Sequence, residues 1–127
     1  MSTFENRVSF VTGAGSGIGE AMALKLAAEG STVVCSDINE QGAQATAARV
    51  EELDAKAVVS ALDTANEEAV KEALTKTTCD LGRLDVLMNN AGVGGKNWET
   101  TTAINLDGVY YGLIHACPIM ACQGGGA

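Results

Sequence analysis

A glycine-rich segment, Thr12 to Gly19 (TGAGSGIG), separates a β-branched run at 8–11 from a helical pattern over 18–29. A strand followed at once by a glycine turn and a helix brings backbone N–H groups together at the helix N-terminus, where an anion is favoured. Ile18 stands where the general G-x-G-x-x-G fingerprint would place its last glycine. The segment therefore predicts an α/β fold with a phosphate-binding turn, whose candidate residues are Gly13, Ser16, Gly17, Ile18 and Gly19.

A second β-branched run, Thr32 to Asp37, follows the first helix within the length of one βαβ crossover, so the two strands should be parallel. Asp37 ends this run. A carboxylate at that place can accept hydrogen bonds from both ribose hydroxyls of an adenosine and would repel a 2′-phosphate, which favours NAD over NADP. In the alternative interpretation, Asp37 only caps the loop before Asn39 and Glu40.

The pattern of strand and helix continues along the chain. Residues 40–53 predict a surface helix, although Gly42 and Thr46 weaken it. A third strand is expected at 56–62, a helix from Asn66 to about Thr78, and a fourth strand at 84–88. The third strand leads into Asp63-Thr64 and the fourth into Asn89-Asn90-Ala91-Gly92. Asp63 or Thr64 could simply cap the helix that follows, and the two asparagine amides can bond neighbouring strand ends.

The order of these motifs, each after an expected strand, resembles the short-chain dehydrogenase/reductase family, and residues 89–112 look like its hydroxyprostaglandin dehydrogenase branch. The resemblance implies a Rossmann-like doubly wound parallel sheet of order 3-2-1-4, NAD(H) as cofactor, and hydride transfer between NAD and a secondary alcohol or ketone. In such proteins Asp63 would bond the adenine with Thr64 beside it, and Asn90, Ala91 and Gly92 would line the cofactor's ribose side. Asn105 would help to position a water molecule in a proton relay, or else is a polar helix residue that bonds a backbone carbonyl or water.

The family's catalytic tyrosine, the lysine four residues after it and the upstream serine have no match in this chain. Tyr110 and Tyr111 are the two tyrosines, and His115 follows Tyr111 at the fourth place. These two positions belong to the helical segment that carries Asn105, and not to the helix that carries the family's active site. Ordinary packing is therefore the better interpretation of the Tyr111 and His115 pair. We therefore expect residues 1–127 to form a single, truncated dinucleotide-binding domain that turns over slowly or not at all. The alternative is a non-catalytic nucleotide-binding or self-associating module.

The last helical segment is expected from Trp98 to about Gln123, irregular around 100–102, with Pro118 kinking or ending it. Without further strands, the strand at 84–88 becomes a sheet edge that invites pairing with another chain. The helix would also expose an apolar side formed by Ile104, Val109, Leu113 and Ile114. These features predict a homo-oligomer, or else a poorly folded fragment.

Composition excludes several other classes of function. The net charge of −8, without a lysine or arginine cluster, argues against nucleic acid or an anionic membrane as partner. The chain begins without the basic and apolar regions of a signal peptide and has no apolar run long enough to span a membrane, so we expect a cytoplasmic protein. Four cysteines without a C-x-x-C pair are expected to be free thiols, and His115, Cys117 and Cys122 fit no common zinc pattern.

Overall fold

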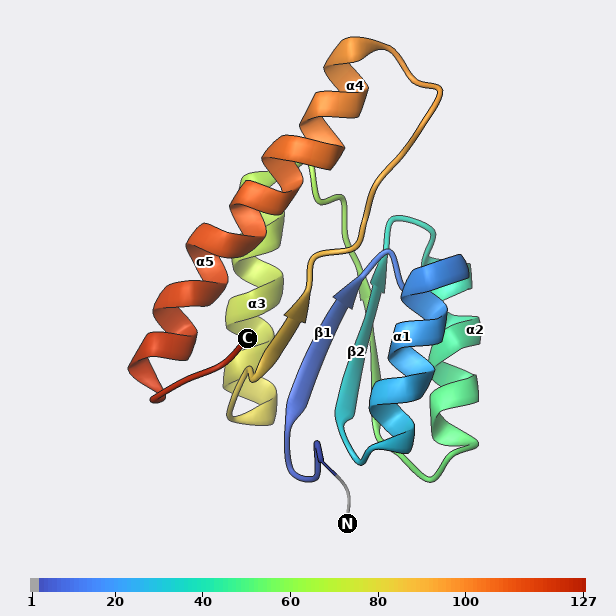
Figure 1. Ribbon diagram of the computed structural model, residues 1–127, viewed down its shortest axis with the longest axis vertical. Coiled ribbons are helices and arrows are strands. Elements are labelled where there is room, and N and C mark those ends of the chain that lie inside the picture. Colours follow the sequence, from blue (N-terminus) through green and yellow to red (C-terminus); the bar gives the residue numbers. More distant parts are fainter. Residues whose placement is uncertain (1–2) are drawn as a thin grey trace.

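Four parallel strands form the centre of the structure, a computed structural model in which residues 3–127 are described (Figure 1). They are β1 (Val8–Thr12), β2 (Thr32–Asp37), β3 (Ala57–Ala61) and β4 (Val86–Met88). Their order in the sheet is β3-β2-β1-β4. This result confirms the Rossmann-like α/β class and the 3-2-1-4 strand order that the family resemblance implied.

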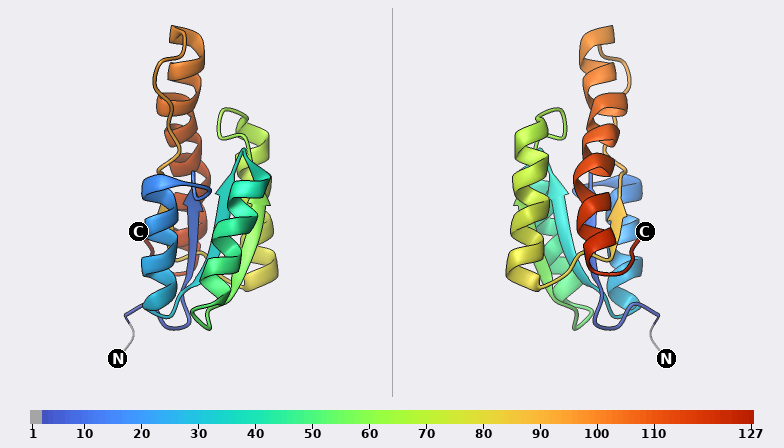
Figure 2. Two further views of the ribbon diagram at one scale, coloured as in Figure 1. Left: turned by 90° about the vertical axis from the view of Figure 1, so that its right-hand side faces the viewer. Right: turned by 90° about the vertical axis from the view of Figure 1, so that its left-hand side faces the viewer.

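Helices cover both faces of the sheet. The main ones are α1 (Gly17–Ala28), α2 (Glu40–Glu51), α3 (Glu67–Leu81) and α5 (Gly108–Cys122). The two side views show α1 and α2 on one face and α3 and α5 on the other (Figure 2). A short helix α4 (Trp98–Thr102) and a π-helical turn, η1 (Ala103–Asp107), precede α5 and extend beyond the end of the sheet (Figure 1).

Side chains that alternate along the strands divide the core into two parts. Val11, Val33 and Cys35 pack against the α1 and α2 side, together with Leu26 and Val50. The neighbouring positions Phe10 and Val34 point the other way and join a cluster with residues of α3 and α5, including Leu74, Ala116 and Met120. The central strands are therefore apolar on both faces, as a sheet covered by helices on both sides requires.

The C-terminal helical segment differs from the expectation in two places. Helix α5 continues past Pro118 and ends at Cys122, close to the expected end near Gln123, so of the two effects expected of Pro118 the helix end does not occur there. Pro118 itself is exposed, while Ala116 and Met120 on either side of it are buried in the core and hold the segment helical. The irregular turn lies at 103–107 instead of 100–102.

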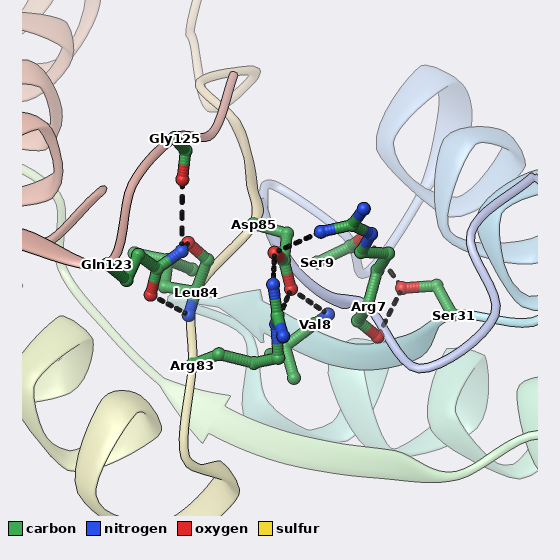
Figure 3. Close-up of polar contacts among 9 residues, drawn as sticks. All are labelled: Arg7, Val8, Ser9, Ser31, Arg83, Leu84, Asp85, Gln123 and Gly125. Carbon is green, nitrogen blue, oxygen red and sulfur yellow. Dashed lines mark hydrogen bonds and ion pairs between the residues drawn. The ribbon is translucent and has the colours of Figure 1, made fainter. Parts of the chain in front are cut away.

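The outer edge of β4 is partly covered by the chain's own tail (Figure 3). Gly124 and Gly125, at φ 95° and 152°, turn the chain back after α5. The Gln123 side chain then bonds both backbone groups of Leu84, while Ala127 donates its N–H to Asp85 O (2.9 Å) and accepts from Leu87 N (2.9 Å). The strand is terminal in the sheet, as expected, but this edge is less open than the sequence predicted.

Asp85 ties the start of β4 to the start of β1 (Figure 3). Its carboxylate accepts hydrogen bonds from Arg83 Nε (2.7 Å), from the Val8 amide (2.8 Å) and from Arg7 Nη1 (3.2 Å). Burial acts to raise the pKa of Asp85, but these hydrogen bonds outweigh it and leave the pKa below its ordinary value. This ion cluster lies at the end of the sheet opposite the site described below.

Candidate functional site

A cavity of about 380 Å³ lies at the carboxyl ends of the four strands. It is lined by every residue predicted to bind the cofactor except Gly19, namely Gly13, Ser16, Gly17, Ile18, Asp37, Asp63, Thr64, Asn90, Ala91 and Gly92. The carboxyl ends of parallel strands meet at one edge of a doubly wound sheet, and ligands bind there. The fold thus brings together motifs that are up to 79 residues apart, as the contact between Thr12 and Ala91 illustrates.

The glycine turn has the backbone that its sequence requires. Gly13 and Gly17 adopt φ values of 67° and 56°, which favour glycine. Ser16 is the N-cap of α1, yet its side chain makes no capping hydrogen bond within the described chain. The N–H groups of the first helical turn therefore remain available to an anion in the cavity.

Gly19 does not line the cavity because it faces the turn from behind. A Cβ built on Gly19 would lie 2.6 Å from the Gly13 carbonyl carbon and 2.7 Å from Asn90 Nδ2. A Cβ on Gly13 would in turn lie 2.8 Å from that same amide nitrogen. The missing side chains let helix α1, the turn and the end of β4 approach one another closely.

Asp37 ends β2 and lies beside the glycine turn. Its Oδ2 accepts a hydrogen bond from Gly15 N (2.8 Å), and its Oδ1 accepts one from Asn39 N (2.9 Å). The loop-capping role that the sequence left as an alternative is therefore present. Because an ionised carboxylate offers about four acceptor positions, two of them remain for a ligand.

The turn after β4 is organised by Thr12, at the end of β1. The Thr12 hydroxyl accepts hydrogen bonds from the backbone N–H groups of Asn90 (3.0 Å) and Ala91 (3.0 Å) and donates to Met88 O (3.2 Å). Asn90 Nδ2 donates back to Thr12 O (3.1 Å), so Asn90 bonds a neighbouring strand end as expected. Asn89 does not, because its Nδ2 donates to Val109 O of helix α5 (2.9 Å).

Asp63 and Thr64 form the adjoining wall of the cavity. Asp63 Oδ1 accepts a hydrogen bond from Ala65 N (2.9 Å) and so stabilises the turn after β3. The N-cap of α3 is Asn66, whose side chain accepts from Ala69 N, and neither Asp63 nor Thr64 caps that helix. The Asp63 carboxylate keeps acceptor positions for a ligand on the cavity side.

Asn105 lies in the π-helical turn and faces Val93, which lines the cavity. Its Oδ1 accepts a hydrogen bond from Val93 N (2.8 Å) and its Nδ2 donates to Val93 O (2.8 Å). The Asn105 side chain therefore bonds both backbone groups of Val93, as a neighbouring strand would, and fixes the loop after Gly92. This finding supplies the backbone-bonding role that the sequence left open for Asn105.

Sequence reasoning missed several residues of the cavity wall, namely Ser36, Ile38, Leu62, Val93 and Ile104. Ser36 is 1% exposed, and its Oγ has no hydrogen-bond partner within residues 3–127. Ile38 is 72% exposed although it is large and apolar. The one sequence signal for these wall residues was Ile38, an apolar residue that directly follows the acid Asp37 at the end of a strand.

The remaining candidate groups lie elsewhere. His115 Nε2 bonds Glu67 Oε1 (3.1 Å), whereas Tyr111 packs against the core, so the structure does not pair them. The four cysteines are free, and no group of three or more His, Cys, Asp or Glu within residues 3–127 could hold a metal ion. Among the helices of the same described part, none has both the length and the apolar character needed to cross a membrane.

A parallel order of 3-2-1-4, a glycine turn before α1 and an acid at the end of β2 define a dinucleotide-binding α/β fold. Comparison with known families gives a more specific result: the short chain dehydrogenase family model matches residues 7–127. The chain therefore belongs to the short-chain dehydrogenase/reductase family, whose members are oxidoreductases that depend on a nicotinamide dinucleotide.

Individual relatives agree with this assignment. The chain is 37% identical to cyclohexanol dehydrogenase of Acinetobacter sp. (strain SE19), over 98% of this chain and 53% of that protein. It is 40% identical to 15-hydroxyprostaglandin dehydrogenase [NAD(+)] of Homo sapiens, over 94% of this chain and 46% of that protein. The crystal structure of NAD⁺-bound xylitol dehydrogenase superposes with a TM-score of 0.93 at 31% identity, covering 98% of this chain and 52% of that one. The chain spans about half the length of these relatives.

Proposed function

We propose that this chain binds NAD(H) in the cavity at the carboxyl ends of its strands. The observation that carries the proposal is the convergence of the glycine turn, Asp37 and the turn at 90–92 on that one cavity. Two relatives whose names include NAD, the prostaglandin dehydrogenase and the NAD⁺-bound xylitol dehydrogenase, also support NAD(H) as the cofactor.

The residues present fit such a cofactor. The uncapped N-terminus of α1 would hold the pyrophosphate, because no lysine or arginine among residues 3–127 lines the cavity and backbone amides must supply the donors. Asp37 would accept the two hydroxyls of the adenosine ribose. The unpartnered Ser36 Oγ, buried within residues 3–127 at the cavity wall, is a further polar group that suits a ligand.

The charge on Asp37 supports NAD over NADP. No described side-chain ion pair neutralises this carboxylate, and the next residue, Ile38, brings no cation. A 2′-phosphate at the ribose would meet this negative charge, whereas a 2′-hydroxyl would donate to it.

For the whole enzyme we propose hydride transfer between the nicotinamide ring and a secondary alcohol or ketone. The cofactor would supply the hydride chemistry, and the protein would supply orientation and a proton path. In this chain neither tyrosine is followed by lysine at the fourth position, so we propose that it is inactive or very slow alone. Asn105, which fixes Val93 at the cavity, would take the proton-relay position of the whole enzyme.

Calorimetric titration tests the binding proposal. We expect NAD to bind the wild-type chain, and Asp37→Asn to weaken NAD binding about tenfold or more, because charge-assisted hydrogen bonds to the ribose are lost. Asp80→Asn is the matched control, since Asp80 pairs with Lys76 on the exposed side of α3. Equal NAD affinity for wild type and Asp37→Asn would remove the role of Asp37, and NADH formation at an ordinary enzymatic rate would contradict the proposed inactivity.

We also propose that the chain self-associates through α5. Exposed apolar residues recur every three or four positions, as on one helical face: Leu106 at the end of η1, and Tyr110, Leu113 and Cys117 in α5. Of the side predicted from sequence, only Leu113 is exposed, because Ile104, Val109 and Ile114 are half-buried. A second copy of the chain could cover the stripe by packing its own α5 alongside.

Sedimentation velocity tests the self-association. Leu113→Lys should convert dimers or larger species to monomers, because it buries a charge in the proposed contact. Leu53→Lys is the control, since Leu53 is exposed to a similar extent but follows α2. A monodisperse wild-type monomer would refute this proposal and leave NAD binding untouched.

A further inference from the structure

Two residues that weaken helix α2 in the sequence, Gly42 and Thr46, both lie against the glycine turn. A Cβ on Gly42 would lie 3.0 Å from Gly15 O and 3.2 Å from Gly15 Cα, so α2 approaches the turn more closely than a side chain would allow. Thr46 is 1% exposed, and its Oγ1 donates a hydrogen bond to Ala14 O (2.8 Å). Their place in the helix is thus explained by contact with the turn.

The group that Thr46 bonds belongs to the same peptide unit that holds Asp37. Ala14 O and Gly15 N are the two polar atoms of one planar peptide bond. Thr46 Oγ1 donates to its oxygen (2.8 Å), and its N–H donates to Asp37 Oδ2 (2.8 Å). The Thr46 hydroxyl of α2 and the Asp37 carboxylate at the end of β2 are therefore hydrogen-bonded to opposite sides of one rigid peptide unit.

This linkage has two physical consequences. Hydrogen bonds in a chain polarise one another, so a donor on the carbonyl strengthens the N–H as a donor to the carboxylate. Removing the hydroxyl would also leave the Ala14 carbonyl buried beside α2 without that donor, which favours rotation of the peptide toward another partner. Rotation would take the Gly15 N–H away from Asp37 and release one of its carboxylate oxygens.

We propose that Thr46 is a positioning residue that fixes the carboxylate of Asp37 through the Ala14–Gly15 peptide and so sets the preference for an unphosphorylated ribose. Thr46 is not part of the cavity wall and acts only through this peptide. The proposal rests on the proposed NAD site, in which Asp37 accepts the ribose hydroxyls. It gives α2 a part in cofactor selection that its sequence, as a surface helix, did not indicate.

The test compares Thr46→Val, which keeps the shape and removes the donor, with Thr46→Ser, which keeps the donor. Titrations of NAD and NADP should show that Thr46→Val weakens NAD binding about fivefold, the equivalent of one net hydrogen bond, while NADP binding stays the same or improves. Thr46→Ser should retain the wild-type ratio of the two affinities. Thr77→Val is the matched control, because the hydroxyl of the buried Thr77 donates to Ala73 O within its own helix, α3.

A double-mutant cycle separates positioning from general stability. In an Asp37→Asn background, Thr46→Val should cause no further change in the ratio of NAD to NADP affinity, since the residue through which it acts is already altered. An equal loss of affinity for both dinucleotides in the single variant would overturn the proposal, and so would a full effect in the double variant.

A measurement on the ligand-free chain distinguishes this proposal from the proposed function. In ¹⁵N-labelled protein, the Gly15 amide should exchange with solvent at least about tenfold faster in Thr46→Val than in wild type. Unchanged Gly15 exchange would overturn the positioning role even if NAD binds. Faster Gly15 exchange in a chain with no affinity for NAD would support the linkage to Asp37 and refute the proposed function, together with the effect on specificity that depends on it.

Discussion

Substituting alanine for Gly19 is expected to separate the glycine turn from helix α1. The added Cβ would lie 2.6 Å from the Gly13 carbonyl carbon, and the carbonyl oxygen is nearer still. Nonbonded carbons prefer about 3.5–4.0 Å, so the two backbones must move apart by about 1 Å. Overpacking of this kind usually lowers the free energy of unfolding by about 1–3 kcal/mol.

The same displacement should weaken NAD binding, because it moves the first-turn amides of α1 relative to Asp37. Loss of one hydrogen bond to a charged group removes about 1.5–3 kcal/mol, which corresponds to an affinity about 10- to 150-fold lower. Gly94→Ala is the control, since a Cβ on Gly94 meets no described atom within 4 Å. Calorimetry for NAD and thermal unfolding followed by circular dichroism measure both effects. NAD affinity and melting temperature equal to those of Gly94→Ala would refute the close-packing explanation for Gly19.

Two further predictions concern titratable groups outside the cavity. Burial raises the pKa of the Cys35 thiol to about 11. Alkylation of the native chain at pH 8, followed by peptide mass spectrometry, should therefore label the exposed Cys79, Cys117 and Cys122 well before Cys35. Equal alkylation rates at the four cysteines would contradict the burial of Cys35. The pKa of Asp85 is lowered in the folded state, so its stabilising effect is complete above its unfolded value near 3.8 and is lost as the pH falls through the folded value. Asp85→Asn should therefore lower the free energy of unfolding at pH 7, measured by urea denaturation. It should also make that free energy fall less steeply as the pH is lowered into the acid range. An unchanged decrease at acid pH would show that Asp85 does not contribute.

Much of the fold followed from the sequence because local signals agree with the family resemblance. β-branched runs marked the first two strands and short apolar runs the other two, and asparagines or glycines marked the ends of helices, as Asn66 and Gly82 do for α3. Once consecutive strands are parallel and their crossovers right-handed, the order of the sheet is restricted to few choices. The glycine turn and Asp37 followed from motifs placed after parallel strands, which meet at one edge, whereas Asp63, Thr64 and residues 90–92 were assigned from the family resemblance.

The remaining features depend on contacts between distant segments. Ser36 and Thr46 line or support the site through positions that only the packing of β2 and α2 against the turn defines. Asn89 bonds helix α5 instead of a strand, which no local pattern indicates. Pro118 is a strong local signal for the end of a helix, but burial of Ala116 and Met120 outweighed it.

The central claim is that the glycine turn, the end of β2 and the turn after β4 form one NAD site. Titration of the ¹⁵N-labelled chain with NAD, followed by two-dimensional NMR of its backbone amides, tests this most directly. The amides of residues 13–19, 36–38 and 90–93 should shift together along one saturating curve, while those around Asp85 at the opposite end of the sheet stay in place. The absence of any shift, or shifts confined to the Asp85 end, would contradict the claim.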